Sequence, residues 1–171
     1  MKKMSVYFLF LFAANIICAQ VSQDSLSKMA LDYMSAYSEW NVEKMGAFYK
    51  DSVHFKDPTA VEAFQTNFDL VGKDKVMSLL KSVFPDAPPE YASFKVKEHF
   101  VSGTHAIINS NFELVLPKSW FGDSALGKIF VSVPMVTILK FDEKKISSHF
   151  DYVDYNSYQK QISFQVKEKK E

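Results

Sequence analysis

A change of hydrophobic period near residue 90 is the feature that most constrains what this chain can fold into. Before it, apolar residues recur at three- and four-residue steps, as Leu26, Met29, Tyr33 and Tyr37 do. That spacing is typical of one face of an amphipathic helix. After it, apolar and polar residues alternate, as in "FKVKEHF", which is typical of a half-buried strand. Helices followed by a run of strands predict an α+β fold in which a curved sheet wraps around helices.

The same patterns place the individual elements. We expect three N-terminal helices at residues 26–40, 42–49 and 73–84, and strands at residues 52–57, 91–101, 105–116, 128–142 and 146–155. The last four strands are expected to form an antiparallel meander. Residues 59–72 are expected to be a loop or short excursion, residues 117–127 a connection, and the lysine-rich C-terminal end is expected to fray.

The first residues have the layout of a secretory signal peptide. Lys2 and Lys3 precede an apolar run over residues 6–19, which is too short for a comfortable membrane span and ends in "CAQ". We therefore expect a signal peptide at residues 1–19, one domain at residues 20–171, and an exported protein that is periplasmic or secreted. A lipoprotein anchored through Cys18 is the alternative, although Ile17 is bulky where a lipid-attachment motif needs a small residue.

Removal of this leader changes which partners the composition allows. It takes the balance from 20 basic and 20 acidic residues to 18 and 20, and it removes the only cysteine. The remaining chain can form no disulfide, and no further segment is suited to stable membrane insertion. Every basic residue except histidine is lysine. Because arginine supplies the planar fork that grips phosphate, nucleic-acid binding has little support.

Motifs for cofactors and nucleophiles are missing from the sequence. It contains no GxGxxG, GxxxxGK[ST] or GxSxG, which are the signatures of nucleotide cradles and hydrolase nucleophiles. The four histidines do not fall at the short spacings of zinc sites. We expect neither a cofactor nor a metal ion.

Asp57 and two tyrosines are candidate functional residues. Alternation puts Phe55 and Asp57 on one side of the first strand. Asp57 precedes Pro58 and is either a turn former or a carboxylate at the rim of an apolar cavity, where desolvation raises its pKa. Tyr33 and Tyr37 share one helix face. Both are either core aromatics or hydrogen-bond donors into such a cavity.

The last strand has two distinct rows of side chains. His149, Asp151 and Val153 form one row, and Ile146, Ser148, Phe150 and Tyr152 form the other. The second row is clearly the more apolar, so alternation alone favours a solvent-facing position for His149 and Asp151.

Three segments together resemble a known superfamily. "FYKDSVHFKDP", "GKDKVMSLL" and "KISSHFDYVDY" resemble the SnoaL-like and ketosteroid-isomerase-like members of the nuclear transport factor two superfamily. The resemblance implies three helices packed in a strongly curved, mainly antiparallel sheet, a cone-shaped α+β barrel or cystatin-like roll around a pocket. It also implies a homodimer and a small apolar ligand.

The resemblance also implies roles for single residues. The isomerases' Y-x-D-x-x-x-x-x-D-P stretch stands here as Tyr49, Asp51, Asp57 and Pro58. Asp57 falls on their general base and Tyr33 on their oxyanion-binding tyrosine, whereas Thr137 stands where they keep a protonated acid. His149 with Asp151 resembles the pair of SnoaL-type cyclases, which faces the pocket. This expectation reverses the one from alternation. Epoxide hydrolases of the superfamily need an arginine, which this chain lacks.

Two hypotheses about function follow. The first is a cofactor-independent isomerase, cyclase or dehydratase that moves a proton on a small apolar carbonyl compound. Its catalytic residues are Asp57, Tyr33, His149 and Asp151, and its ligand-binding residues are Tyr37, Phe55, Met135, Thr137 and Val153. The second is a non-catalytic ligand-binding or dimerisation module, because one fold hosts many functions.

Overall fold

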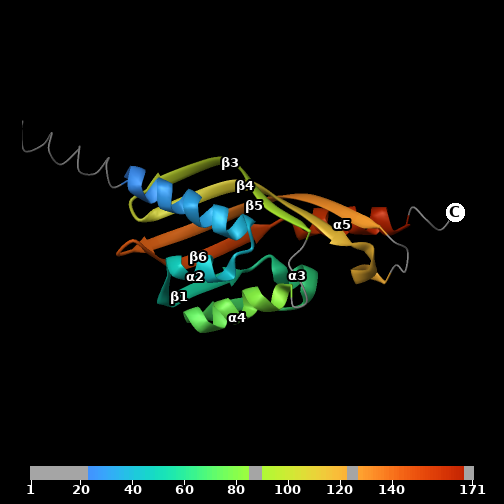
Figure 1. The fold of residues 1–171 in the computed structure, drawn as a ribbon, viewed down its shortest axis with the longest axis horizontal. Coiled ribbons are helices and arrows are strands. Elements are labelled where there is room, and N and C mark those ends of the chain that lie inside the picture. Colours follow the sequence, from blue (N-terminus) through green and yellow to red (C-terminus); the bar gives the residue numbers. More distant parts are fainter. Residues whose placement is uncertain (1–22, 85–89, 123–126, 168–171) are drawn as a thin grey trace, which may run out of the picture.

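The computed structural model describes residues 23–84, 90–122 and 127–167 (Figure 1). A first helix over residues 23–38 is followed by α2 (Val42–Phe48), β1 (Tyr49–Asp57), α3 (Ala60–Phe64), β2 (Phe68–Val71), α4 (Lys73–Val83), β3 (Tyr91–Ser102), β4 (His105–Pro117), the 3-10 helix η1 (Lys118–Phe121), β5 (Lys128–Asp142), β6 (Lys145–Val153) and α5 (Tyr155–Lys167). The expected signal peptide lies outside the described residues. Among the helices of those three ranges, none is long and apolar enough to cross a membrane.

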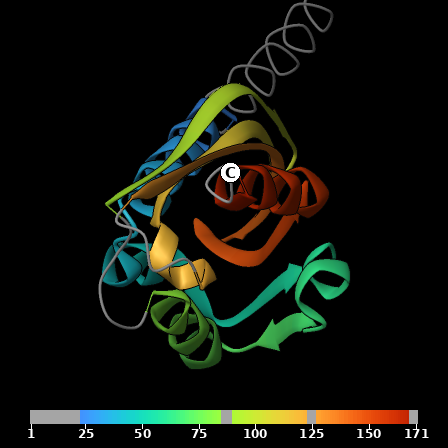
Figure 2. The same ribbon diagram turned by 90° about the vertical axis from the view of Figure 1, so that its right-hand side faces the viewer.

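One six-stranded sheet organises the molecule. Its order is β2-β1-β6-β5-β4-β3, and only β1 and β6 run parallel to each other. Figure 2 shows the sheet curling from β3 at the top to β2 at the bottom, without closing into a barrel. The expected α+β fold with a strongly curved, mainly antiparallel sheet is confirmed.

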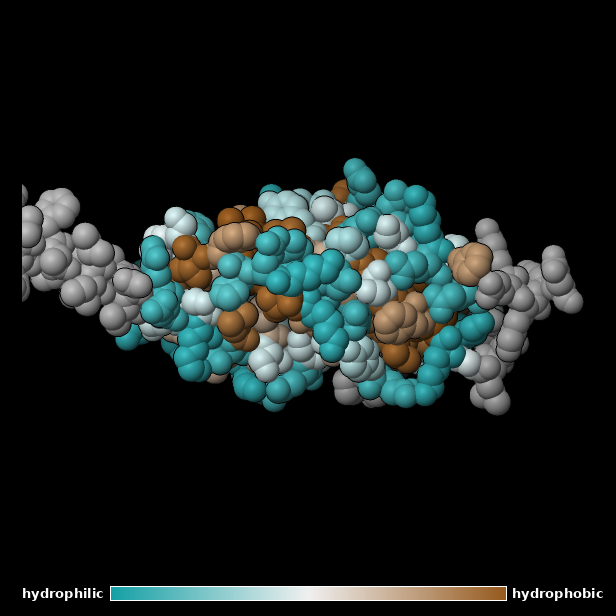
Figure 3. Space-filling view, turned by 90° about the horizontal axis from the view of Figure 1, so that it is seen from above, coloured by the Kyte–Doolittle hydropathy of each residue, from teal (hydrophilic) through white to brown (hydrophobic). Residues whose placement is uncertain are grey.

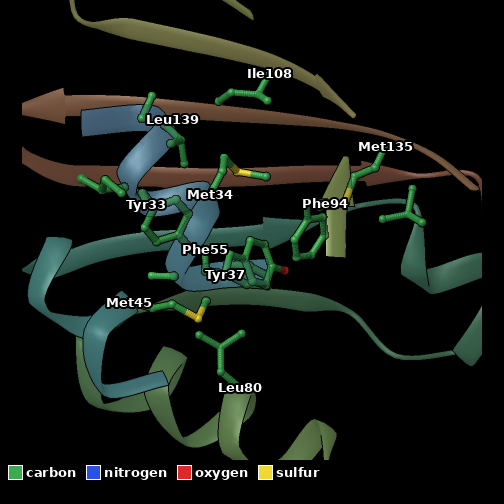
Figure 4. Packing of buried hydrophobic residues seen from close by; sticks show 14 of the residues in the cluster. Tyr33, Met34, Tyr37, Met45, Phe55, Leu80, Phe94, Ile108, Met135 and Leu139 are labelled. Carbon is green, nitrogen blue, oxygen red and sulfur yellow. The ribbon is translucent and has the colours of Figure 1, made fainter. Parts of the chain in front are cut away.

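The concave side of the sheet holds the hydrophobic core. Ala30, Tyr33, Met34 and Tyr37 of the first helix are buried at helical spacing. Figure 4 shows Tyr37 beside Phe94 of β3, with Met45 and Leu80 below them in the view. The first helix therefore lies inside the curl, as its periodicity predicts.

A β-bulge in β6 explains why simple alternation misplaces His149. Phe141 pairs with Ile146, but the neighbouring Lys140 pairs with Ser148, so Ser147 is an extra residue on β6. The extra residue shifts the phase by one, and Ile146, His149 and Asp151 are all buried. The expectation from alternation that His149 and Asp151 face solvent is wrong. Their inward orientation, which the family resemblance implies, is what the structure shows.

Two segments expected to be irregular are ordered. Residues 59–72 contain α3 and β2, and β2 pairs with β1 from His54 to Asp57. The chain after β6 forms α5, and β6 ends at Val153, two residues earlier than expected. The end of the lysine-rich segment that was expected to fray, residues 168–171, lies outside the described residues. Asp154 begins this helix, since its carboxylate accepts hydrogen bonds from the Ser157 N–H at 2.9 Å and the Ser157 hydroxyl at 2.7 Å.

Helix α5 binds the part of β5 that β6 does not reach. β6 pairs with β5 only as far as Met135. Beyond that point, the Gln161 side chain accepts from the Ser132 N–H at 2.9 Å and donates to the Ser132 carbonyl at 2.8 Å. Gln165 does the same with Phe130, at 3.0 and 2.7 Å. Two glutamines one helical turn apart thus match two strand residues spaced two apart.

Some large apolar side chains remain on the surface. Phe100, Ile107 and Phe130 are 58%, 43% and 50% exposed. Figure 3, seen from above, shows hydrophobic residues in several patches among hydrophilic ones. The expected homodimer stays a prediction.

Candidate functional site

A cavity of about 400 Å³ opens between the sheet, the first helix, α4, α5 and the β4–β5 connection. Its walls are mostly aromatic and aliphatic, and include Trp40, Phe94, Phe112, Trp120 and Phe121. Two carboxylates, Asp57 and Asp151, are set into these walls. This combination of an apolar enclosure and a few convergent polar groups is typical of small-molecule sites.

The Asp57 carboxylate accepts four hydrogen bonds. One oxygen, Oδ1, accepts from the Thr59 N–H at 3.0 Å, the Thr59 hydroxyl at 2.6 Å and the Ala60 N–H at 3.1 Å. The other, Oδ2, accepts from the Tyr155 hydroxyl at 2.6 Å. Asp57 therefore holds the first N–H groups of α3 and also lines the cavity. Burial raises the pKa of Asp57, and the hydrogen bonds from Thr59 and Tyr155 oppose that rise.

Asp151 lies at the centre of the polar part of the site and is 2% exposed. Its Oδ1 accepts a hydrogen bond from the Thr137 hydroxyl at 2.7 Å, and its Oδ2 accepts one from the Tyr37 hydroxyl at 3.0 Å. His149 Nε2 also lies 3.0 Å from Oδ2, but its N–H direction does not suit a hydrogen bond. The histidine–carboxylate contact is therefore electrostatic in this arrangement.

Two tyrosines fix the other side of the His149 ring. His149 Nδ1 lies 3.0 Å from the Tyr33 hydroxyl and 2.8 Å from the Tyr49 hydroxyl, and those two hydroxyls are 2.6 Å apart. All three side chains are buried. If Nδ1 carried a proton, one of the two hydroxyl protons would have no acceptor among these three groups. Hydrogen-bond counting thus assigns Nδ1 as the acceptor, and the proton of the neutral ring lies on Nε2, beside Asp151.

Tyr33, Tyr37 and Tyr49, the tyrosine cluster, keep their protons. Burial raises the pKa of each of these hydroxyls above its ordinary value. The charge of Asp151 acts in the same direction on all three, because a second negative charge beside it is unfavourable. The cluster therefore supplies hydrogen-bond donors rather than bases.

The sequence-predicted site residues divide into two groups. Those that line the cavity are Tyr37, Phe55, Asp57, Met135, Asp151 and Val153. Those that lie behind this lining are Tyr33, Thr137 and His149. Tyr33 makes its hydrogen bonds to Tyr49 and His149 rather than to Asp57. Thr137, at the position where the isomerases keep an acid, donates to Asp151. Asp151 thus contacts three of the predicted residues, which are Tyr37, Thr137 and His149.

Helix α5 contributes site residues that the sequence reasoning missed. Tyr155 and Tyr158 both line the cavity. Burial raises the pKa of the Tyr158 hydroxyl, which has no hydrogen-bond partner in the described part of the chain. A signal for this helix is present, because Asp154 precedes apolar residues at helical spacing in "DYNSYQKQI". Trp120 and Phe121, from the connection between β4 and β5, also line the cavity.

Comparison with known proteins identifies the family. The family model of the SnoaL-like domain matches residues 30–149. The chain belongs to the SnoaL-like domain family. A comparison of the sequence with curated proteins gives no match.

Solved structures show the same fold. A candidate SnoaL-like polyketide cyclase from Shewanella denitrificans aligns with a TM-score of 0.70 at 23% identity, over 82% of this chain and 98% of that one. A protein with a ketosteroid isomerase-like fold from Catenulispora acidiphila, in complex with trimethylamine, aligns with a TM-score of 0.62 at 16% identity, over 79% and 92%. An epoxide hydrolase from M. tuberculosis aligns at 0.61 and 11%, over 84% and 92%. This SnoaL-like protein therefore has a fold of the small-molecule-binding type.

Proposed function

We propose that this SnoaL-like protein binds a small, mainly apolar molecule in its cavity and transfers a proton on it, with Asp151 as the base. One observation carries the proposal. The Asp151 carboxylate is buried in a mainly apolar cavity wall, 3.0 Å from His149 Nε2. Aligned solved structures that include a candidate cyclase and an epoxide hydrolase support it at the level of the fold.

The proposed chemistry suits a carbonyl compound. Asp151 takes the proton from the carbon next to the carbonyl group, and the electron pair of that C–H bond moves onto the carbonyl oxygen as an enolate. Tyr158 lines the same cavity, and its hydroxyl, which has no hydrogen-bond partner in the described residues, is the proposed donor to that oxygen. In a β,γ-unsaturated ketone, the enolate is conjugated with the C=C bond; return of the proton at the γ-carbon re-forms the C=O bond, shifts the C=C bond to the α,β position and completes an isomerisation. General-base and oxyanion contributions each give about 100-fold or more.

His149 and its tyrosines position Asp151 in this scheme. With Nδ1 accepting from Tyr33 or Tyr49, the Nε2 proton stays beside Asp151 Oδ2. The Tyr33 hydroxyl thus supports the base through His149 instead of meeting the substrate.

The alternative assignment, with Asp57 as the base and Tyr33 as the oxyanion donor, stays a prediction and has less support than the assignment of Asp151. Asp57 lines the cavity and has a pKa raised by burial, both of which suit a base. However, four donors already occupy its carboxylate. This occupancy also favours the second candidate function, a non-catalytic ligand-binding module. Export of the protein, expected from its N-terminal residues, is likewise a proposal, and detection of the cleaved chain outside the cytoplasm tests it.

Deuterium exchange tests the proposed chemistry without a known substrate. The protein is incubated in D₂O with a panel of cyclic ketones, and incorporation of deuterium next to the carbonyl is followed by NMR. We expect exchange above the buffer rate, reduced about 100-fold by Asp151→Asn. The exposed Asp142→Asn serves as a charge-matched control. If panel members bind but none exchanges, the binding module is correct. If Asp57→Asn alone abolishes exchange in a stably folded protein, Asp57 is the base.

A further inference from the structure

The charges of the cavity lining are all of one sign. Among the described residues that line it, the ionisable groups are two carboxylates and three phenols, and none is lysine, arginine or histidine. From this we infer that the ligand carries a positively charged amine on an apolar body. The inference rests on the proposed function in that the cavity must bind a small molecule.

The two carboxylates lie next to each other. β1 and β6 are parallel neighbours in which Phe55 pairs with His149 and Lys56 with Phe150. Asp57 and Asp151 are the next residues along these two strands, and both side chains are buried on the concave side. Neighbouring strands are about 4.8 Å apart, so two like charges meet at one end of an apolar cavity. A cation placed between them removes this repulsion.

The hydrogen-bonding groups of the cavity also favour a positively charged amine as the ligand. The tyrosine hydroxyls of Tyr37 and Tyr155 already donate to Asp151 and Asp57. Asp57 Oδ2 accepts only that one hydrogen bond and has a lone pair to spare. Among the described residues that line the cavity, Tyr158 has the hydroxyl without a partner, so acceptors outnumber free donors there. A ligand that brings several N–H donors matches this shortage, and an ammonium group brings them with a positive charge.

Aromatic rings surround the remaining space. Tyr37 lies against Phe94 and Trp40, with ring centroids 4.2 and 5.5 Å apart, and Phe84 stacks on Trp120 at 6.0 Å. The faces of such rings attract cations and also pack against hydrocarbon. Binding of an anionic ligand is disfavoured, because its charge would lie beside two carboxylates without a counter-charge from the described lining.

A matched ligand series tests the inference. We would titrate the purified protein at pH 7 with 3-phenylpropylamine, 3-phenylpropan-1-ol and 3-phenylpropanoate, which share one skeleton. Trp40 and Trp120 line the cavity, so tryptophan fluorescence reports binding and calorimetry confirms it. We expect the amine to bind at least ten-fold more tightly than the alcohol, and the carboxylate at least ten-fold more weakly than the alcohol.

Variants and a neutral dye separate the possible outcomes. Asp151→Asn should reduce the advantage of the amine over the alcohol by ten-fold or more, whereas the exposed Asp142→Asn should leave it unchanged. The inference is overturned if the amine binds no better than the alcohol, or if its advantage survives in Asp151→Asn. Binding of the alcohol and of the uncharged dye Nile red would then show that the cavity still binds small molecules. If neither these two nor the amine binds, the proposed function fails as well.

Discussion

Replacing Asp57 by alanine removes the acceptor of four hydrogen bonds, three from the start of α3 and one from Tyr155 of α5. Loss of an acceptor for the first N–H groups of a helix costs about 1 kcal/mol. A largely buried Tyr155 hydroxyl left without an acceptor costs about 1–3 kcal/mol more. Part of this sum is offset, because burial raises the pKa of Asp57 and removal of the buried charge relieves that cost. We expect a net loss of about 2–3 kcal/mol, or a melting temperature about 4–12 °C lower.

Asp57→Asn is the informative companion to the alanine variant. Asparagine keeps Oδ1, so the Thr59 and Ala60 N–H groups retain their acceptor, and its amide can donate to the Tyr155 oxygen. The Tyr155 O–H loses its acceptor while its oxygen gains a donor, so we expect a loss of about 1 kcal/mol, smaller than that of the alanine variant. Urea unfolding followed by circular dichroism and tryptophan fluorescence measures both variants. The reasoning is refuted if the two variants lose the same free energy of unfolding, or if the alanine variant is as stable as the unchanged protein.

The other predictions concern the buried tyrosines and the C-terminal helix. The tyrosine cluster has folded-state pKa values above the unfolded value of about 10, so above that pH the folded state binds more protons and loses stability. Above pH 10 the free energy of unfolding should fall by about 1.4 kcal/mol per pH unit for each tyrosine, and urea unfolding between pH 9 and 11 should show this fall. ¹⁵N NMR should find Nδ1 of neutral His149 without a proton. A Tyr33→Phe, Tyr49→Phe double variant should show a mixture of His149 tautomers. A protonated Nδ1 in the neutral ring of the unchanged protein would contradict the hydrogen-bond counting. Gln161→Ala should cost about 1–3 kcal/mol and speed proteolysis within α5, since it frees a backbone N–H and carbonyl of β5. Gln159→Ala, which loses a bond to α3 instead, is the control, and equal effects would argue against the edge contacts.

The sequence predicts a residue's position well where one local rule decides it. Alternation in β1 correctly places Phe55 and Asp57 on the buried side, and helical spacing places Tyr33 and Tyr37 there. His149 is different, because its side of the sheet depends on a bulge at Ser147. That bulge is defined by pairing with β5 and leaves no mark on the spacing within β6.

Hydrophobic spacing cannot predict contacts between segments that are far apart in the sequence. The Tyr33 hydroxyl bonds to residues 16 and 116 positions away, and Asp57 bonds to Tyr155, 98 positions away. No spacing rule relates such positions. The family resemblance supplied the orientation of the His149 row, but it did not supply the tyrosines of α5, a helix that the sequence analysis did not expect.

The pairing of Gln161 and Gln165 with β5 has a consequence for solubility. An exposed strand edge with free N–H and C=O groups is a template on which a second chain can add, which leads to aggregation. In this protein two amide side chains occupy those groups at Phe130 and Ser132. A chain that loses residues 155–171 would keep its six strands but present an open edge ending in an exposed Phe130. The C-terminal helix therefore protects the folded protein from self-association along its sheet.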